Sequence, residues 1–331
     1  MPIDRRLSVA PMMAFTDRHA RYFLRQISRR TLLYTEMITS GAIVFGDQFK
    51  HLEYHQDEHP VAAQLGGNKP DELAKAARWV ARLGYDEVNL NVGCPSDRVK
   101  SGCFGAALMG EPQTVANCVS AMRDACSLPV TVKCRIGIDD LDTYDHLVHF
   151  IDTVSRGGCD TFIIHARKAW LTGLSPKENR EIPPLNYPRV YRLANDFSDL
   201  TFVLNGGIKS LDAVIEDAGP LDGAMVGRQA YAEPWMLSEA DSRIFGVDDK
   251  ALERHEVALS MRDYVRDHCA RGERASHVLR HMLGLYQGMP GARHWRRTLS
   301  QQMNERNAGP DTIERAVDAV TTIIERQRNA A

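Results

Sequence analysis

The chain has 331 residues, 44% of them hydrophobic and 25% charged, and a formal net charge of −2 at pH 7. This composition is typical of a globular protein and excludes a largely disordered chain. No apolar run reaches the roughly 18 residues of a membrane helix, and MPIDRRLSVAPM has too short an apolar stretch for a signal peptide, so we expect a cytoplasmic protein without membrane contact.

Short apolar runs alternate with amphipathic stretches along the first two thirds of the chain. Runs such as VTVKC, TFIIH and TFVLN are almost wholly apolar, which is typical of parallel strands covered on both faces. The predicted strands are 7–10, 33–37, 61–65, 87–92, 130–135, 161–165, 201–205 and 223–227, with helices such as 71–83, 114–126 and 144–156 between them. Eight such strands within about 225 residues predict a (β/α)8 TIM barrel. A doubly wound sheet is the alternative, but no GxGxxG motif follows the first strand.

After residue 246 the strand pattern stops and helical patterns take its place. Residues 250–271 and 310–327 are predicted helices, and the stretch between them is helical apart from a turn at 288–293. We therefore expect an α/β barrel domain over 1–246 and a smaller all-helical domain over 247–331.

Positive charge is concentrated in the predicted helical domain. Residues 251–331 hold 13 Arg and no Lys against 10 acidic residues, and the stretch 276–297 has four Arg, three His and no acidic residue. Such clustering on an otherwise acidic chain predicts a local binding surface for a polyanion. A solvated basic helix face is the alternative.

Polar or special residues follow seven of the eight predicted strands, where a TIM barrel carries its active site. They are Pro11, Met12 and Met13; Gln64; Asn91 and Cys94; Lys133 and Arg135; His165; Asn205, Gly206 and Gly207; Gly227 and Arg228. The glycines leave backbone N–H groups unobstructed and Arg228 adds a guanidinium, which predicts a phosphate site after the last two strands. The alternative is that these glycines only form tight turns.

Two of these residues have a competing structural interpretation. Lys133 lies in an apolar strand and needs an anionic partner, either a cofactor in the barrel mouth or a nearby acid such as Glu36. His165 is either a core histidine bonded to backbone or a functional group at its strand end.

The seven cysteines form no CxxC pair and no Cys/His cluster, so we expect free thiols in a reducing compartment and no metal site. Cys94 follows a strand end on a loop and is the candidate catalytic thiol; Cys103, in the loop KSGCFGAALMG, competes with it. The cysteines in predicted helices and strands are expected to be packing residues.

These strand ends and their flanking segments resemble the tRNA-dihydrouridine synthases, and among them the A-type bacterial subfamily. The similarity covers nearly the whole chain and includes NLNVGCPSDRV, HARKAWLTGLSPKENREIPPL, NGGIKS, MVGRQAY and RHMLGLYQGMPGARHWRR. The resemblance implies an FMN enzyme that reduces the 5,6 double bond of uridine in the tRNA D-loop, at positions 20 and 20a, with NADPH as reductant. It also implies that the helical domain binds tRNA.

The resemblance further assigns roles to individual residues. Reduced flavin would deliver hydride to uracil C6, Cys94 would protonate C5, and Lys133 would stabilise the charge of the reduced cofactor. The implied flavin contacts are Pro11, Met12, Met13, Gln64, Lys133, His165, Asn205, Gly206, Gly207, Gly227 and Arg228. The implied tRNA contacts are Asn91, Lys177, Arg180, Arg293 and Arg296. Ala107 stands where many relatives have a second cysteine, and Cys103 lies outside the family pattern.

Two other functions remain open at this point. A flavin barrel acting on a free pyrimidine would share the barrel and the phosphate site but would have no use for an arginine-rich helical domain. A non-catalytic RNA-binding barrel protein would bind no flavin. We expect this chain to be a monomer.

Overall fold

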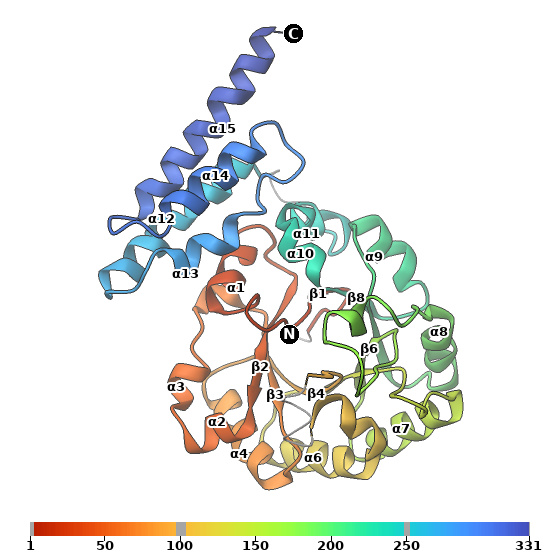
Figure 1. Cartoon of the computed structure of the whole chain (residues 1–331). Helices are drawn as coiled ribbons and strands as arrows, with labels where there is room; N and C mark the ends of the chain where they lie inside the picture. Colours follow the sequence, from red (N-terminus) through yellow and green to blue (C-terminus); the bar gives the residue numbers. More distant parts are fainter. Residues whose placement is uncertain (1–2, 97–103, 248–251, 331) are drawn as a thin grey trace. The chain divides into compact units, whose positions relative to one another are not determined.

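The computed structural model describes residues 3–96, 104–247 and 252–330, and its centre is a closed barrel of parallel strands (Figure 1). Neighbouring strands pair in chain order and the eighth pairs with the first, Leu7 lying opposite Ala224. The strands are β1 (Leu7–Val9), β2 (Leu32–Thr39), β3 (Val61–Gly66), β4 (Glu87–Val92), β5 (Val130–Arg135), β6 (Thr161–His165), β7 (Thr201–Asn205) and β8 (Gly223–Val226). The TIM-barrel prediction is confirmed.

The interior of the barrel is divided between an apolar and a polar part. A buried apolar cluster comes from β2, β3, β6, β7 and β8 and the residue after β1: Ala10, Leu32, Tyr34, Ala62, Ile163, Val203 and Met225. Polar side chains of β3, β4 and β5 occupy the rest, because alternate residues of a strand point to the same face. We call the buried polar side chains of β3, β4 and β5 the polar wall.

Helices cover the outside of the barrel, as apolar strands with two buried faces require (Figure 1). In α4, Pro70 starts the helix, two acids occupy its first turn, and Leu73, Ala76 and Val80 form the buried stripe. The helices of this unit are α2 (Ser40–Phe45), α3 (Gln48–His51), η1 (Gln56–Glu58), α4 (Pro70–Arg82), η2 (Gly105–Gly110), α6 (Pro112–Ala125), α7 (Tyr144–Arg156), η3 (Glu178–Arg180), α8 (Tyr187–Asp196) and α9 (Leu211–Ala218).

The chain forms two compact units, residues 1–14 with 31–227 and residues 15–30 with 228–331. The second unit consists of α1 (Arg18–Arg25), α10 (Arg228–Ala232), η4 (Pro234–Leu237), α11 (Ala240–Arg243), α12 (Arg254–Ala270), α13 (Ser276–Leu279), η5 (Arg280–Met282), α14 (Ala292–Gln302) and α15 (Pro310–Ala330). The predicted boundary at residue 246 therefore differs from the division by contacts, which also assigns 15–30 to the helical unit.

Side-chain bonds explain why residues 15–30 belong to the helical unit. Asp241 accepts hydrogen bonds from Ser28 Oγ at 2.6 Å and from the backbone N–H of Arg29 at 2.7 Å. The ring of Tyr22 stacks on that of Tyr264 in α12 at 3.9 Å between centroids. Such partners more than 200 positions away in the sequence leave no local signal.

The core of the helical unit surrounds Trp295. Its ring is fully buried, packs against Tyr286 and donates its indole N–H to the carbonyl of Met282 at 2.9 Å. Leu299, one turn further along α14, is buried beside it, so the arginines of that helix face outwards. Among the described residues, none of the helices has the length and hydropathy required of a transmembrane span.

Candidate functional site at the carboxyl ends of the strands

A chain of hydrogen bonds runs along the polar wall inside the barrel. Glu87 Oε1 accepts from the hydroxyl groups of Tyr34 and Thr131, at 2.7 and 2.6 Å, and Thr131 Oγ1 accepts from Asn89 Nδ2 at 2.8 Å. Asn89 Oδ1 accepts from Gln64 Nε2 at 2.8 Å. Gln64 Oε1 in turn accepts from Asn91 Nδ2 at 2.8 Å. These buried groups are paired from strand to strand, so the amides of Gln64 and Asn91 are held in one orientation.

Asn91 fixes the turn that carries Cys94. Its Oδ1 accepts the backbone N–H groups of Gly93 at 3.1 Å and of Cys94 at 3.0 Å, and the carbonyl of Cys94 accepts the N–H of Ala106 at 2.9 Å. The Cys94 thiol is partly exposed and lies 3.4 Å from Ser96 Oγ. The candidate thiol therefore lies on a hydrogen-bonded turn immediately beyond β4.

Three of the other thiols differ from Cys94 in their surroundings, whereas Cys126 and Cys269 are partly exposed as Cys94 is. Cys118, Cys134 and Cys159 are buried, and burial raises the pKa of Cys118 and of Cys134 to about 12. They are packing residues, as predicted. Cys103, the predicted competitor of Cys94, lies outside the described residues.

Lys133 and Asn205 connect three strands at the barrel mouth. Lys133 Nζ donates to Asn205 Oδ1 at 2.9 Å, and Asn205 Nδ2 donates to the carbonyl of Met225 in β8 at 2.8 Å. The alternative partner Glu36 accepts the backbone N–H of Ala14. Burial, reinforced by the charge of Arg135, lowers the pKa of Lys133 to about 8. The described partner of Lys133 is thus a neutral amide, and the ammonium group retains its capacity to bind an anion.

Arg135, which was predicted at a strand end but given no part in the implied flavin or tRNA contacts, holds the surrounding loops. Its guanidinium is buried and donates to the carbonyls of Gly93 at 2.9 Å and of Lys168 and Asn179 at 3.0 Å each. The sequence signal was available, because residues two apart in a strand share a face and Arg135 follows Lys133 by two. Arg135 links the Cys94 turn to the loop after β6.

His165 lies in a strongly positive environment. Burial, followed by the charges of Arg135, Lys133, Arg167 and Arg180, holds its pKa well below the usual histidine value. The ring is therefore neutral near pH 7, with one nitrogen able to donate and the other able to accept. The cations that depress its pKa make the mouth of the barrel attractive to anions.

The two glycines after β7 have backbone conformations that other residues would strain. Gly206 has φ of 112° and Gly207 has φ of 78°. A Cβ at Gly206 would lie 2.6 Å from the His165 ring, and one at Gly207 would lie 2.5 Å from the side chain of Leu185. A side chain is excluded at both positions, which is consistent with backbone that a ligand approaches closely.

The remaining predicted residues of the barrel lie at its rim. Met12 is partly buried against the apolar cluster and Met13 is 53% exposed. Gly227 follows β8 directly. Lys177 precedes η3 and Arg180 is its last residue, and both are exposed on the loop after β6. The buried side-chain amide of Asn179 holds this loop through bonds to the backbone of Trp170.

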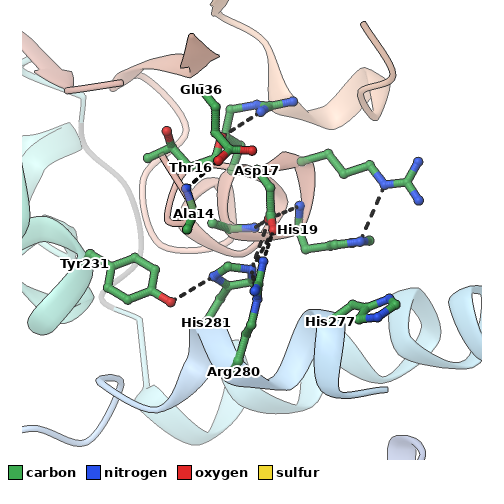
Figure 2. A network of polar contacts seen from close by, with 12 residues as sticks. Ala14, Thr16, Asp17, His19, Glu36, Tyr231, His277, Arg280 and His281 are labelled. Atoms are coloured by element: carbon green, nitrogen blue, oxygen red, sulfur yellow. Dashed lines mark hydrogen bonds and ion pairs between the residues drawn. The ribbon is translucent and has the colours of Figure 1, made fainter. Parts of the chain in front are cut away.

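Within the helical unit, Arg293 and Arg296 lie one turn apart on the exposed side of α14. Arg296 lines a hollow of about 560 Å³ together with Arg280, Tyr231 and Gln287, and its guanidinium donates to Gln287 Oε1. Figure 2 shows Arg280 and His281 meeting at Asp17, with Tyr231 on the other ring nitrogen of His281. Asp17 lies 2.5 Å from the Arg280 guanidinium and 3.0 Å from His281 Nε2, and Tyr231 Oη lies 3.1 Å from His281 Nδ1. Arg228 is the first residue of α10 and also belongs to this unit.

Comparisons with known proteins give a consistent result. The family described as "Dihydrouridine synthase (Dus)" matches residues 8–323. A Vibrio vulnificus protein named "tRNA-dihydrouridine(20/20a) synthase" is 55% identical over 94% of this chain and 96% of its own length. An Escherichia coli K12 protein of the same name is 56% identical over 95% of this chain and 91% of its own. A solved old yellow enzyme homologue from Zymomonas mobilis is far more distant, at 14% identity and a TM-score of 0.48 over 71% of this chain and 87% of its own.

Proposed function

This chain belongs to the dihydrouridine synthase family, and we propose that it reduces the 5,6 double bond of uridine in tRNA, at positions 20 and 20a of the D-loop. We propose FMN as its bound cofactor, NADPH as its reductant, and the cytoplasm as the place where it acts, as a monomer. The observation that carries the proposal is the turn held by Asn91, which places the partly exposed thiol of Cys94 beside an electropositive barrel mouth. Relatives named "tRNA-dihydrouridine(20/20a) synthase" that match nearly the whole chain support it.

The residues at the barrel mouth fit an anionic flavin nucleotide. Lys133 has a neutral described partner, Gly206 is partly exposed and Gly207 is exposed, and neither glycine has room for a Cβ. In the proposal the two glycines, Gly227 and Arg228 hold the phosphate, while Lys133, His165, Gln64 and Asn205 bind the ring system next to Pro11, Met12 and Met13. When bound, the flavin supplies the hydride that reduces the uracil ring at C6.

Cys94 has the position and chemistry of a general acid for C5 of the uracil. The turn fixed by Asn91 and Arg135 keeps the thiol at the mouth of the barrel, where a base extruded from the tRNA would enter. A thiol donates its proton to carbon and is reprotonated from water, so Cys94 undergoes no net change over a turnover. Lys133 stabilises negative charge that develops on its side of the mouth.

The tRNA contacts in the proposal are Asn91, Lys177 and Arg180 near the site and Arg293 and Arg296 on α14. The exposed arginines of α14 suit contacts with the phosphate backbone of an RNA. Such contacts position the RNA without reading its sequence. This use of the helical unit favours tRNA over a free pyrimidine as the substrate.

The decisive experiment maps dihydrouridine in tRNA from cells that lack this protein. We expect positions 20 and 20a to carry unmodified uridine, and expression of the chain to restore dihydrouridine at both. The purified chain should be yellow, with the absorption of an oxidised flavin. Normal dihydrouridine at both positions in the deletion strain would overturn the proposed substrate, and a colourless protein that folds normally would favour a non-catalytic RNA-binding protein.

A further inference from the structure

Two histidines and a glutamate gather where α12 ends and α13 begins. They are His268 near the end of α12, Glu273 in the connecting turn, and His277 in α13. One ligand atom from each of the three lies within 4.8 Å of the other two. None of these residues is part of the barrel site described above, and all three belong to the helical unit.

His268 is the unusual member of this group. Its side chain is 1% exposed, and neither ring nitrogen has a hydrogen-bond partner among the described residues. Buried polar atoms are nearly always paired, so an imidazole with both nitrogens free calls for a partner that the protein itself does not supply. The neighbouring ligand atoms of Glu273 and His277 identify the side on which that partner would lie.

The turn between the helices brings the glutamate back towards His268. Gly272 has φ of 83°, and its N–H bonds to the carbonyl of Cys269 at 2.9 Å, which reverses the chain after α12. Glu273 Oε2 then lies 3.5 Å from His277 Nδ1. Two ligands bound at about 2.1 Å in a tetrahedron are about 3.4 Å apart, so this pair already has the required spacing.

We propose that His268, Glu273 and His277 form a binding site for Zn²⁺ or a similar transition-metal ion in the helical unit. Two imidazoles and one carboxylate are a donor set that suits zinc, whereas magnesium and calcium prefer oxygen ligands alone. The side chains of Glu273 and His277 are about half exposed, which leaves the fourth position of a tetrahedron open to water. The ion would join the end of α12 to α13.

The surroundings of His268 favour the neutral imidazole that a metal requires. Burial, followed by the charges of Arg18 and His277, lowers the pKa of His268, while Glu273 acts in the opposite direction. The ring of His19 lies edge to face with the ring of His268, with 4.5 Å between their centroids. The ring of His277 also lies edge to face with that of His268, with 5.6 Å between centroids. Arg18 and Arg271 reduce the attraction for a cation, so the imidazole and carboxylate bonds must supply the affinity.

Titration calorimetry of Zn²⁺ into the full-length, metal-stripped protein tests the site, with Co²⁺ absorption to report the ligand type. We expect one equivalent of Zn²⁺ to bind and to raise the melting temperature. His277→Gln and Glu273→Gln should each weaken this binding by at least about tenfold. His255→Gln, which removes an exposed histidine elsewhere on α12, is the matched control and should bind as the unaltered chain does.

Both exposed substitutions should leave the fold intact, so the test does not depend on replacing the buried His268. Equal affinity in all four proteins would overturn the site and place the metal elsewhere. Thiolate charge-transfer bands with Co²⁺ that persist in His277→Gln would overturn it in the same way. No binding by the unaltered chain would also exclude it.

Discussion

Asn91 connects the hydrogen-bonded interior of the barrel to the turn that carries Cys94. Its side-chain amide is bonded on one side to Gln64 and on the other to the N–H groups of Gly93 and Cys94. A carbonyl oxygen that accepts two backbone N–H groups is the arrangement found at helix caps and Asx turns, and here it holds a turn at a strand end. The position of Cys94 therefore depends on residues inside the barrel.

The two competing thiols give a direct test at this scale. Cys94→Ala should retain flavin and tRNA binding and should still oxidise NADPH, but it should form dihydrouridine about 10²–10⁴-fold more slowly because the general acid is missing. Single-turnover measurement of dihydrouridine, with flavin reoxidation followed in parallel, separates these steps. Cys103→Ala is the control and should lose less than about tenfold. A dead Cys103→Ala beside an active Cys94→Ala would reverse the assignment.

Arg228 tests the phosphate site independently of the chemistry. Arg228→Ala removes a charge-assisted contact that is typically worth about 1.5–3 kcal/mol, so flavin retention after dialysis should fall about tenfold or more. The flavin content per protein, read from absorbance, measures this. An exposed arginine outside the site, such as Arg297→Ala, should keep its flavin. Equal retention in both variants would remove Arg228 from the cofactor site.

At the level of elements, apolar patterning was sufficient to place the barrel strands. The predicted strands 87–92, 130–135, 161–165 and 201–205 coincide with β4 to β7. Each is short and rich in β-branched or other apolar residues, which is typical of strands covered on both faces. The helix predicted at 144–156 coincides with α7 for the corresponding reason, a clear amphipathic stripe between a capping Thr143 and Gly157. These signals are local, and a single sequence contains them.

Patterning carries no information about contacts between residues that are remote in the chain. Residues 15–30 were included in the barrel because they lie between two strands, whereas Asp17 and Ser28 bond to Arg280 and Asp241. The importance of Arg135 was missed for a similar reason, since its acceptors are three backbone carbonyls on distant loops. Carbonyl acceptors carry no residue-type signature.

His19 in α1, the first helix of the chain, leads us to expect that the free energy of unfolding depends on pH. His19 is buried and bonded to Tyr264 Oη at 2.9 Å, and burial, partly opposed by Asp17, lowers its pKa to about 3. The unfolded chain takes up this proton near pH 6.5, so stability is lost as pH falls below 6.5 towards 3. Between pH 6.5 and 4.5 the loss from this residue should be roughly 2 kcal/mol.

Urea unfolding at several pH values, with a chelator present, measures that loss. His19→Gln keeps a polar group near Tyr264 but cannot titrate, so its stability should change less between pH 6.5 and 4.5 than that of the unaltered chain. His255→Gln should retain the full dependence. An unchanged slope in His19→Gln would assign the acid sensitivity to other groups.

At the scale of the whole molecule, a net charge of −2 conceals opposite local charges. Replacing Arg293 and Arg296 with Ala should weaken tRNA binding and reduce the slope of log affinity against log salt by up to about two phosphate contacts. Flavin content should be unchanged. Binding measured from low to physiological salt checks this, with Arg262→Ala, whose guanidinium pairs with Glu314, as the control. An unaltered slope would mean that the basic face of α14 is only solvated.

The helical unit is built from two stretches of chain separated by about 200 residues, 15–30 and 228–331. During synthesis, α1 leaves the ribosome first, and at ~5–20 residues per second its partners follow ~10–40 s later. For that interval the apolar side chains that α1 buries, Ala20, Phe23 and Leu24, lack most of their final neighbours. A nascent chain truncated before Arg228 should therefore present a chaperone-binding segment near its N-terminus. A fragment that starts at residue 247 should lack α1, α10, η4 and α11, which belong to the same unit.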